Sequence, residues 1–188
     1  MNDRETLFDI ISRRSLRTGR EFTLASGRKS TVYFNLKPAM LAPDGARLIG
    51  AALAEKAVAL GADYVGGLEM GAVPLVSAAA AMSAVAGRPV GAVFVRKAVK
   101  EHGTRSLIEG LAEGDTLEGK HVLVVEDVTT TGGSSLKAVA ALREAGARVE
   151  HVLTVVDREE GATEAFSAEG IALHALYKKS EFASEGLA

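Results

Sequence analysis

The sequence predicts an α/β protein built on a parallel sheet, with a small appendage at the N-terminus. From residue 43 to residue 176, apolar segments of strand length alternate with helical patterns. The strand segments are apolar on both faces, as in parallel sheets that helices cover on both sides. Residues 1–40 do not follow this alternation. We therefore divide the chain into an N-terminal cap, 1–40, and an α/β core, 41–188.

Composition limits the classes of function. The 188 residues are 47% hydrophobic and 24% charged, which is ordinary for a globular domain with a substantial core. A formal net charge of −2 favours neither nucleic acid nor an anionic membrane as a partner. The chain has no cysteine, which excludes disulfides and thiolate metal sites and fits a reducing compartment. We expect a soluble cytoplasmic protein with no membrane or nucleic-acid partner.

The elements follow in order from local patterns. Residues 3–13 form an amphipathic helix pattern, and 21–35 read as two short strands around a turn at 26–29. Pro43 opens a long helix that Gly61 closes. Further strands are predicted at 64–66, 90–95, 122–125, 149–156 and 171–176, and helices at 72–86, 134–145 and 159–167. The tail, 180–188, shows no assignable pattern.

Residues 97–114 break the alternation with charged residues and three glycines. A loop of this length in a compact domain is typically a functional lid or a disordered segment. It begins at the carboxyl end of a predicted parallel strand, where open α/β sheets bind ligands. We therefore interpret 97–114 as a functional lid rather than as a solvent-exposed loop without a function.

The stretch VLVVEDVTTTGGSS, residues 122–135, joins a buried strand to a helix. Such a turn presents unpaired N–H groups at the positive end of a helix dipole, which suits a phosphate. It is neither a Walker A loop nor a GxGxxG fingerprint. The predicted phosphate cradle comprises Val128, Thr129, Thr130, Thr131, Gly132, Gly133 and Ser134.

Two acids, Glu126 and Asp127, stand directly before this cradle. They would repel a phosphate unless they face vicinal sugar hydroxyls or a Mg²⁺ ion shared with the ligand's phosphates. Acceptors for two vicinal hydroxyls, next to a loop that binds phosphate, indicate a site for a ribose 5-phosphate. The alternative is an ordinary strand-to-helix turn with Asp127 as a cap, but the combined pattern is more specific than a bare Asp-Thr-Gly.

This stretch resembles the phosphoribosyl-pyrophosphate (PRPP) signature of type I phosphoribosyltransferases. The resemblance implies that family's fold, a Rossmann-like parallel sheet flanked by helices with a small N-terminal hood, here 1–40. It also implies a mobile catalytic loop, here 97–114. In this family the two acids hold the ribose hydroxyls and the loop holds the 5-phosphate.

Three further segments resemble orotate phosphoribosyltransferases. FTLASGRKSTVYFN (22–35) resembles their hood, in which the aromatic pair matching Tyr33 and Phe34 lines the orotate pocket; alternatively these rings are hood core. RKAVKEHG (96–103) resembles the catalytic loop. VVDREEG (155–161) supplies Arg158, which matches the arginine that pairs bidentately with the orotate carboxylate; a salt-bridged surface arginine is the alternative. The loop residues expected to bind pyrophosphate are Arg96, Lys97, Lys100 and His102.

Thr130 bears on the choice of base. Hypoxanthine-guanine members have an aspartate at this signature position, suited to a proton on the purine ring. A threonine cannot do that work, so Thr130 argues weakly against that class and is expected beside orotate.

The resemblance implies transfer of the phosphoribosyl group from PRPP to orotate, giving orotidine 5′-monophosphate (OMP) and pyrophosphate, in de novo pyrimidine synthesis. Mg²⁺ would be bound mainly through PRPP, with no metal site of the protein's own. Lys100 and His102 would stabilise or protonate pyrophosphate, while Asp127 orients the ribose. We expect a homodimer in which the loop of one subunit completes the neighbouring site.

Two positions depart from the family pattern. Ala25 and Gly71 stand where some members have lysines. Either Arg28 and Lys29 compensate, or this chain does not use those contacts. Three alternatives also remain at this point: a type I enzyme with another base, a PRPP-sensing regulator without catalysis, and a plain ribose-phosphate binding module.

Overall fold

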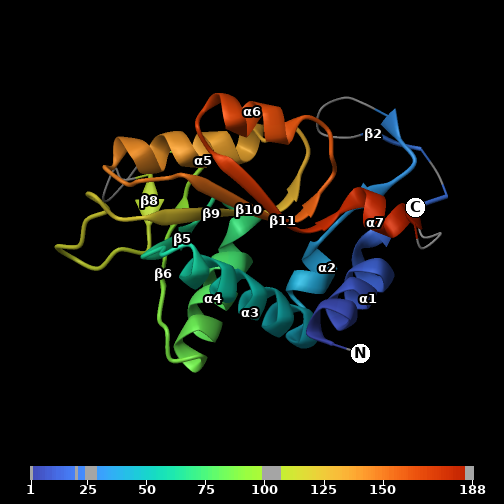
Figure 1. Ribbon diagram of the computed structural model, residues 1–188, viewed down its shortest axis with the longest axis horizontal. Coiled ribbons are helices and arrows are strands. Elements are labelled where there is room, and N and C mark those ends of the chain that lie inside the picture. Colours follow the sequence, from blue (N-terminus) through green and yellow to red (C-terminus); the bar gives the residue numbers. More distant parts are fainter. Residues whose placement is uncertain (1, 20, 24–28, 99–106, 185–188) are drawn as a thin grey trace.

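A computed structural model describes residues 2–19, 21–23, 29–98 and 107–184 of the chain (Figure 1). At its centre lies a five-stranded parallel sheet with the strand order β11-β10-β9-β5-β6. This confirms the predicted α/β class. The strands of this sheet are β5 (Tyr64–Gly66), β6 (Gly91–Ala92), β9 (Val122–Thr129), β10 (His151–Asp157) and β11 (Ala172–Lys178).

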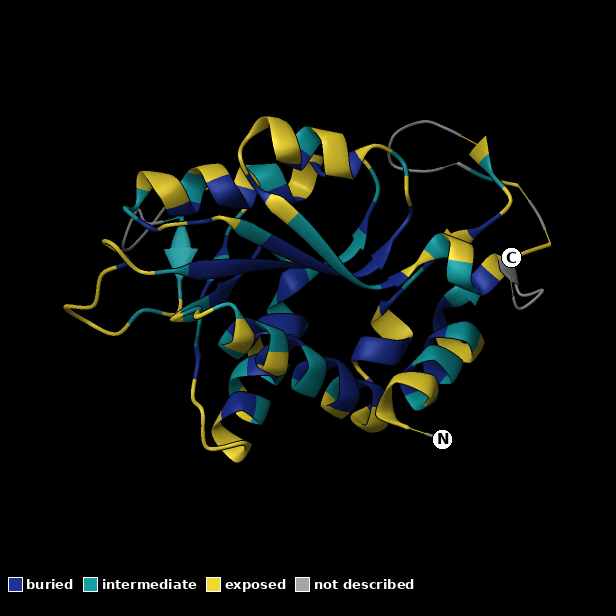
Figure 2. Cartoon of the chain, viewed as in Figure 1, coloured by how far each residue is buried: buried dark blue, intermediate teal, exposed yellow. Residues whose placement is uncertain are grey.

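Helices cover both faces of the sheet, so alternate strand residues enter two separate clusters. On one face Leu123 and Val125 of β9 pack in the cluster that contains Leu53, while on the other Val122 and Val124 pack in the cluster that contains Leu142. Figure 2 shows buried strands between helices with exposed outer faces. The first face carries α1 (Asp3–Ser15), α3 (Pro43–Ala59) and α4 (Ala72–Val85), and the second carries α5 (Gly133–Glu144) and α6 (Ala162–Ala168).

Two predicted strands differ from the structure in ways that affect the site. β9 does not end at Val125 but runs through both acids to Thr129, because its ladder with β10 continues to the pair Thr129 and Asp157. The predicted strand 90–95 is divided into β6 and β7 (Phe94–Val95). β7 pairs antiparallel with β8 (Ile108–Glu109), so the predicted loop 97–114 contains one short strand.

The helix predicted at 159–167 begins only at Ala162. Glu159 has a φ of 58° and Gly161 a φ of 99°, and neither value fits a right-handed helix. Residues 158–161 therefore form a turn between β10 and α6, with Arg158 directly after the end of β10. The turn contains Arg158, one of the predicted site residues.

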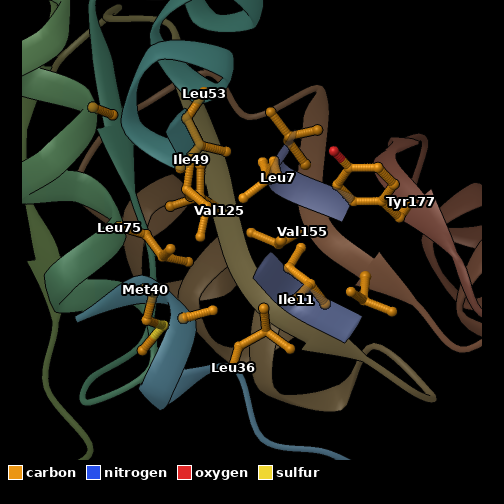
Figure 3. Close-up of a cluster of buried hydrophobic side chains, with 14 of the residues drawn as sticks. Leu7, Ile11, Leu36, Met40, Ile49, Leu53, Leu75, Val125, Val155 and Tyr177 are labelled. Atoms are coloured by element: carbon orange, nitrogen blue, oxygen red, sulfur yellow. The ribbon is translucent and has the colours of Figure 1, made fainter. Parts of the chain in front are cut away.

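The N-terminal segment packs directly on the sheet. α1 begins with a capping box between Asn2 and Glu5, and its Leu7 and Ile11 lie in one buried cluster with Val155 (Figure 3). The division at residue 40 stays a prediction. The other elements of this segment are β1 (Leu16–Arg17), which pairs with β4 (Tyr33–Phe34), β2 (Phe22–Thr23), which pairs with β3 (Lys29–Ser30), and α2 (Lys37–Met40).

The described part of the C-terminal tail is helical. α7 (Lys179–Ser184) buries Phe182, whose ring stacks on Phe8 of α1 at 4.4 Å and meets Phe34 of β4 edge-on at 5.0 Å. The two ends of the described chain therefore share one aromatic cluster. In the described ranges, none of the helices combines the length and the apolar character that a bilayer crossing requires.

Candidate active site

The two acids at the end of β9 lie at the carboxyl edge of the sheet. Glu126 is only 8% exposed, and its Oε2 accepts a hydrogen bond of 3.0 Å from the hydroxyl of Ser135 in the first turn of α5. Asp127 is half-buried, and its Oδ1 accepts a hydrogen bond of 2.8 Å from the backbone N–H of Val128. Both carboxylates are thus held by the strand-to-helix connection.

Burial changes the protonation of Glu126. Desolvation, and secondly the neighbouring charge of Asp127, raise the pKa of Glu126 from 4.5 to about 8, although the Ser135 hydrogen bond opposes this shift. Burial beside Asp127 therefore favours the protonated form of Glu126 in the free protein. A ligand that requires its carboxylate form must displace that proton.

Gly71, in the loop after β5, lies directly against both acids. A Cβ at residue 71 would be 3.3 Å from Asp127 Oδ1 and 3.4 Å from Glu126 Oε1. The two carboxylates thus converge on one place although they follow each other in a strand. The glycine leaves the space in front of them free of a side chain, where some family members place a lysine.

The predicted phosphate cradle encloses a cavity of about 280 Å³. Gly132, with a φ of 82°, is the N-cap residue of α5, and no side chain caps this helix end. The N–H groups of its first turn are thus available to an anion. The Thr129 hydroxyl is buried and has no hydrogen-bond partner within the described residues. The lining residues are Glu126, Val128, Thr129, Thr130, Thr131, Gly132, Gly133, Ser134, Ser135 and Lys137.

Sequence reasoning missed Ser135 and Lys137 in this lining. Lys137 is exposed in α5 and adds a positive charge to a cavity that the backbone already makes attractive to anions. Helical spacing was the available signal, because Lys137 lies four residues after Gly133 and returns to the same face of α5.

Arg158 is buried in the turn that follows β10. It is 2% exposed; its Nε donates to Glu160 at 2.9 Å and its Nη2 donates to the Ser30 hydroxyl at 3.1 Å. Its backbone N–H donates to the carbonyl of Thr129 at 2.9 Å. This arginine is therefore not a solvent-exposed surface residue, and it adjoins the end of the acid-bearing strand.

The aromatic pair of β4 separates into two environments. Tyr33 is 38% exposed and stacks on Phe22 at 5.4 Å, whereas Phe34 is 4% exposed and packs against Phe182. Successive side chains of a strand point to opposite sides, so the two rings do not share one pocket. The burial of Phe34 gives no support to its expected contact with orotate, which stays a prediction.

The described end of the predicted catalytic loop lies beside the loop that contains Gly71. Arg96 follows β7, and its buried Nη1 has no hydrogen-bond partner among the described residues. The backbone N–H of Lys97 donates to Glu69 Oε1 at 2.8 Å. Lys29 pairs with Glu21 at 2.7 Å, a contact that gives no support to its compensating for a missing lysine. Outside the described residues lie Ala25, Arg28, Lys100 and His102.

Comparisons with known proteins agree with this geometry. The family described as "Phosphoribosyl transferase domain" matches residues 42–167. The orotate phosphoribosyltransferase of Bradyrhizobium sp. is 59% identical over 179 residues, which cover 95% of this chain and 96% of the relative.

Solved structures of the Mycobacterium tuberculosis H37Rv orotate phosphoribosyltransferase are also similar. The complex with Fe(III) dicitrate has a TM-score of 0.82 at 39% identity, covering 96% of this chain and 98% of that one. The complex with PRPP has a TM-score of 0.78 at 37% identity, covering 97% of this chain and 99% of that one. The chain belongs to the orotate phosphoribosyltransferases, within the phosphoribosyltransferase family.

Proposed function

We propose that this protein transfers the 5-phosphoribosyl group from PRPP to orotate, giving OMP and pyrophosphate. The observation that carries this proposal is the backbone hydrogen bond from the N–H of Arg158 to the carbonyl of Thr129. It brings a buried guanidinium, suited to a carboxylate, next to a strand end with two acids and a phosphate cradle. The similarity to an enzyme solved with PRPP supports the same donor.

In this proposal PRPP lies along the carboxyl edge of β9. The cradle of residues 128–134 and the first turn of α5 bind the 5-phosphate, and Lys137 adds charge to the same cavity. Glu126 and Asp127 hold the ribose hydroxyls as hydrogen-bond acceptors. Glu126 is buried and has therefore lost most of its contact with water. A ribose hydroxyl would donate a hydrogen bond to it in place of that water.

Orotate lies between the sheet edge and the N-terminal segment. Arg158 binds the carboxylate, Thr130 approaches the base from the cradle, and Tyr33 offers an exposed ring to stack on it. Phe34, the buried neighbour of Tyr33 in β4, stays an expected part of this pocket. The described residues thus provide two polar contacts and one aromatic contact for a planar anion.

The reaction breaks the bond between the anomeric carbon and pyrophosphate, with the electron pair leaving on the pyrophosphate oxygen. The ring nitrogen of orotate, after losing its proton, forms the new bond to that carbon. Positive charge grows on the ribose in between, as in glycosyl transfer generally. Arg96, Lys97, Lys100 and His102 neutralise or protonate the leaving group, while Asp127 orients the ribose and stabilises its charge.

Mg²⁺ fits the donors that converge on Gly71. The oxygens of Glu126 and Asp127 face a space with no side chain, and oxygen donors are those that Mg²⁺ prefers. Among the described residues there is no group of three or more metal-binding side chains, so the ion would be held mainly by PRPP. Its contribution would be to neutralise the phosphates of the donor.

We further propose a cytoplasmic homodimer that acts in de novo pyrimidine synthesis. The lack of cysteine fits a reducing compartment. The homodimer is the assembly that the family resemblance implies. In the dimer, the loop with Lys100 and His102 would complete the neighbouring site.

Orotate turnover tests the proposal. Orotate ultraviolet absorbance is followed after mixing protein, PRPP and Mg²⁺, with each component omitted in turn and with uracil, adenine and hypoxanthine as controls. We expect loss that needs all components and orotate. Turnover of another base would retain the PRPP site but refute the orotate assignment. PRPP binding without any turnover would instead favour a PRPP-sensing regulator.

A further inference from the structure

Ser30 of β3 contacts Arg158 across the sequence. Its Oγ accepts a hydrogen bond of 3.1 Å from Arg158 Nη2, donates to the carbonyl of Val32 at 2.9 Å, and accepts from the N–H of Val32 at 3.1 Å. A hydroxyl has one proton and two acceptor positions, so all its capacity is used. Ser30 therefore has a fixed orientation toward the guanidinium.

Glu160 binds a second nitrogen of the same guanidinium. Arg158 Nε donates to Glu160 Oε1 at 2.9 Å, and Glu160 stands in the turn in which Glu159 has a φ of 58°. The N–H of Glu159 donates to Asp157 Oδ1 at 2.8 Å, which stabilises this turn. Two acceptors on separate segments thus set the plane of the guanidinium.

The remaining edge of Arg158 is available for a ligand. Its side-chain hydrogen bonds to Glu160 and Ser30 use Nε and Nη2, and within the described residues Nη1 donates to no acceptor. A guanidinium in a fixed plane can present two parallel N–H groups to a carboxylate, and that geometry is lost if the plane rotates. Ser30 is the partner that comes from the N-terminal segment.

We propose that Ser30 is a positioning residue that determines substrate specificity, by holding Arg158 in the plane required for a pyrimidine bearing a carboxylate. The inference rests on the proposed function. If Ser30 has this role, selection of a carboxylated base depends on the packing of β3 beside Arg158. Ser30 lies 128 residues from Arg158 in sequence.

A purely structural role of Ser30 predicts a different result. If the hydroxyl only stabilised the turn toward Val32, its loss would lower the amount of folded protein and leave both Michaelis constants of the folded enzyme unchanged. A positioning role acts on orotate alone, because the proposed PRPP contacts come from β9, α5 and the loop after β7, and none comes from β3.

The test compares Ser30→Ala with Ser30→Thr, which keeps the hydroxyl. Ser12→Ala is the matched control, because Ser12 is also part-buried and bonded to a backbone carbonyl, that of Phe8. For Ser30→Ala we expect the KM for orotate to rise about 10-fold, typical for a lost hydrogen bond to a charged group, while the KM for PRPP stays within about 2-fold. Ser30→Thr should recover most of the orotate affinity.

An unchanged KM for orotate in folded Ser30→Ala, or an equal rise in both constants, would overturn the inference. So would a Ser30→Thr enzyme as impaired as the alanine variant. Circular dichroism and PRPP titration confirm folding of each variant. If the unaltered protein fails to consume orotate, the proposed function fails instead, so the two failures are distinguishable.

Discussion

The hydroxyl of Ser135 donates to Glu126 Oε2 at 3.0 Å and joins the first turn of α5 to the acid-bearing end of β9. This bond favours the carboxylate form of Glu126, against the burial that disfavours it. The same serine also lines the phosphate cavity. The acid pair and the phosphate cradle are therefore one connected unit.

Ser135→Ala should weaken PRPP binding in a pH-dependent way. Without this donor the pKa of Glu126 rises further, so less carboxylate is available to the ribose at pH 7. We expect the dissociation constant for PRPP with Mg²⁺ to rise roughly 3- to 10-fold at pH 7 and by less at pH 9. Calorimetric titration measures it, with Ser77→Ala on the exposed side of α4 as control. Equal affinities at pH 7 would contradict the prediction.

Glu126→Gln should stabilise the fold at alkaline pH while impairing catalysis. The pKa of Glu126 is raised from 4.5 to about 8 in the folded protein, so its stabilising contribution is complete below pH 4.5 and is lost as pH rises through 8. Glutamine does not titrate. We expect similar unfolding free energies near pH 5 and an advantage of roughly 1–3 kcal/mol for the variant at pH 9.

Urea unfolding at both pH values measures this difference. The exposed Glu144 of α5 provides the control variant Glu144→Gln, which should follow the unaltered protein at both pH values. A Glu126→Gln variant that is destabilised equally at pH 5 and pH 9 would show that burial of the charge is not the cause.

Gly132→Ala should damage both the fold and the cradle. Gly132 has a φ of 82°, and an added Cβ would lie 2.9 Å from the ring of Phe166, which is fully buried. Gly170 has a φ of 70° with nothing within 4 Å of such a Cβ, so Gly170→Ala isolates the backbone strain, about 1–2 kcal/mol. Gly132→Ala should cost more unfolding free energy than Gly170→Ala and also weaken PRPP binding. Equal losses would indicate that Phe166 moves aside.

Arg158→Lys should separate the two substrates. Lysine keeps the charge, but a single ammonium group cannot replace the planar contacts to Ser30, Glu160 and a carboxylate. We expect the KM for orotate to rise at least about 10-fold with PRPP affinity nearly unchanged. Steady-state kinetics, with orotate and PRPP varied in turn, measure both KM values. A normal KM for orotate would remove Arg158 from the base site.

Mixed dimers test whether the loop acts on the neighbouring subunit. Lys100→Ala and Arg158→Ala should each be almost inactive, and Lys100→Ala should still bind PRPP. If the two residues serve one site from different subunits, mixing the variants with subunit exchange restores up to about a quarter of normal activity, because half the dimers regain one intact site. No recovery despite confirmed exchange would place both residues in the same subunit's site.

Much of the fold was predictable because apolar periodicity reports burial directly. The strand at 64–66 has the predicted bounds, and the long helix from Pro43 ends at Ala59, two residues before the expected stop at Gly61. The length of β9 was not predictable, because Glu126 and Asp127 look like a strand end and only the ladder with β10 extends it. α7 likewise depends on the burial of Phe182 against distant rings.

The residues of the candidate site also divide into those that a local sequence pattern predicts and those that only tertiary contacts bring together. Residues adjacent in sequence, such as the acids and the cradle, were found from their pattern, and Arg158 from its place after a strand. Ser30, Glu160 and Lys137 join the site only through tertiary contacts. The contact expected between Phe34 and orotate stays a prediction, and strand alternation favours Tyr33, whose ring is the exposed one of the pair.

The most direct test of the account measures orotate consumption and pyrophosphate release in the same reaction, with PRPP and Mg²⁺ in excess. Phosphoribosyl transfer to orotate predicts that the two amounts are equal at every time point and that no pyrophosphate appears without orotate. Pyrophosphate release that proceeds without orotate consumption would mean that the site hydrolyses PRPP, and the central claim would be wrong.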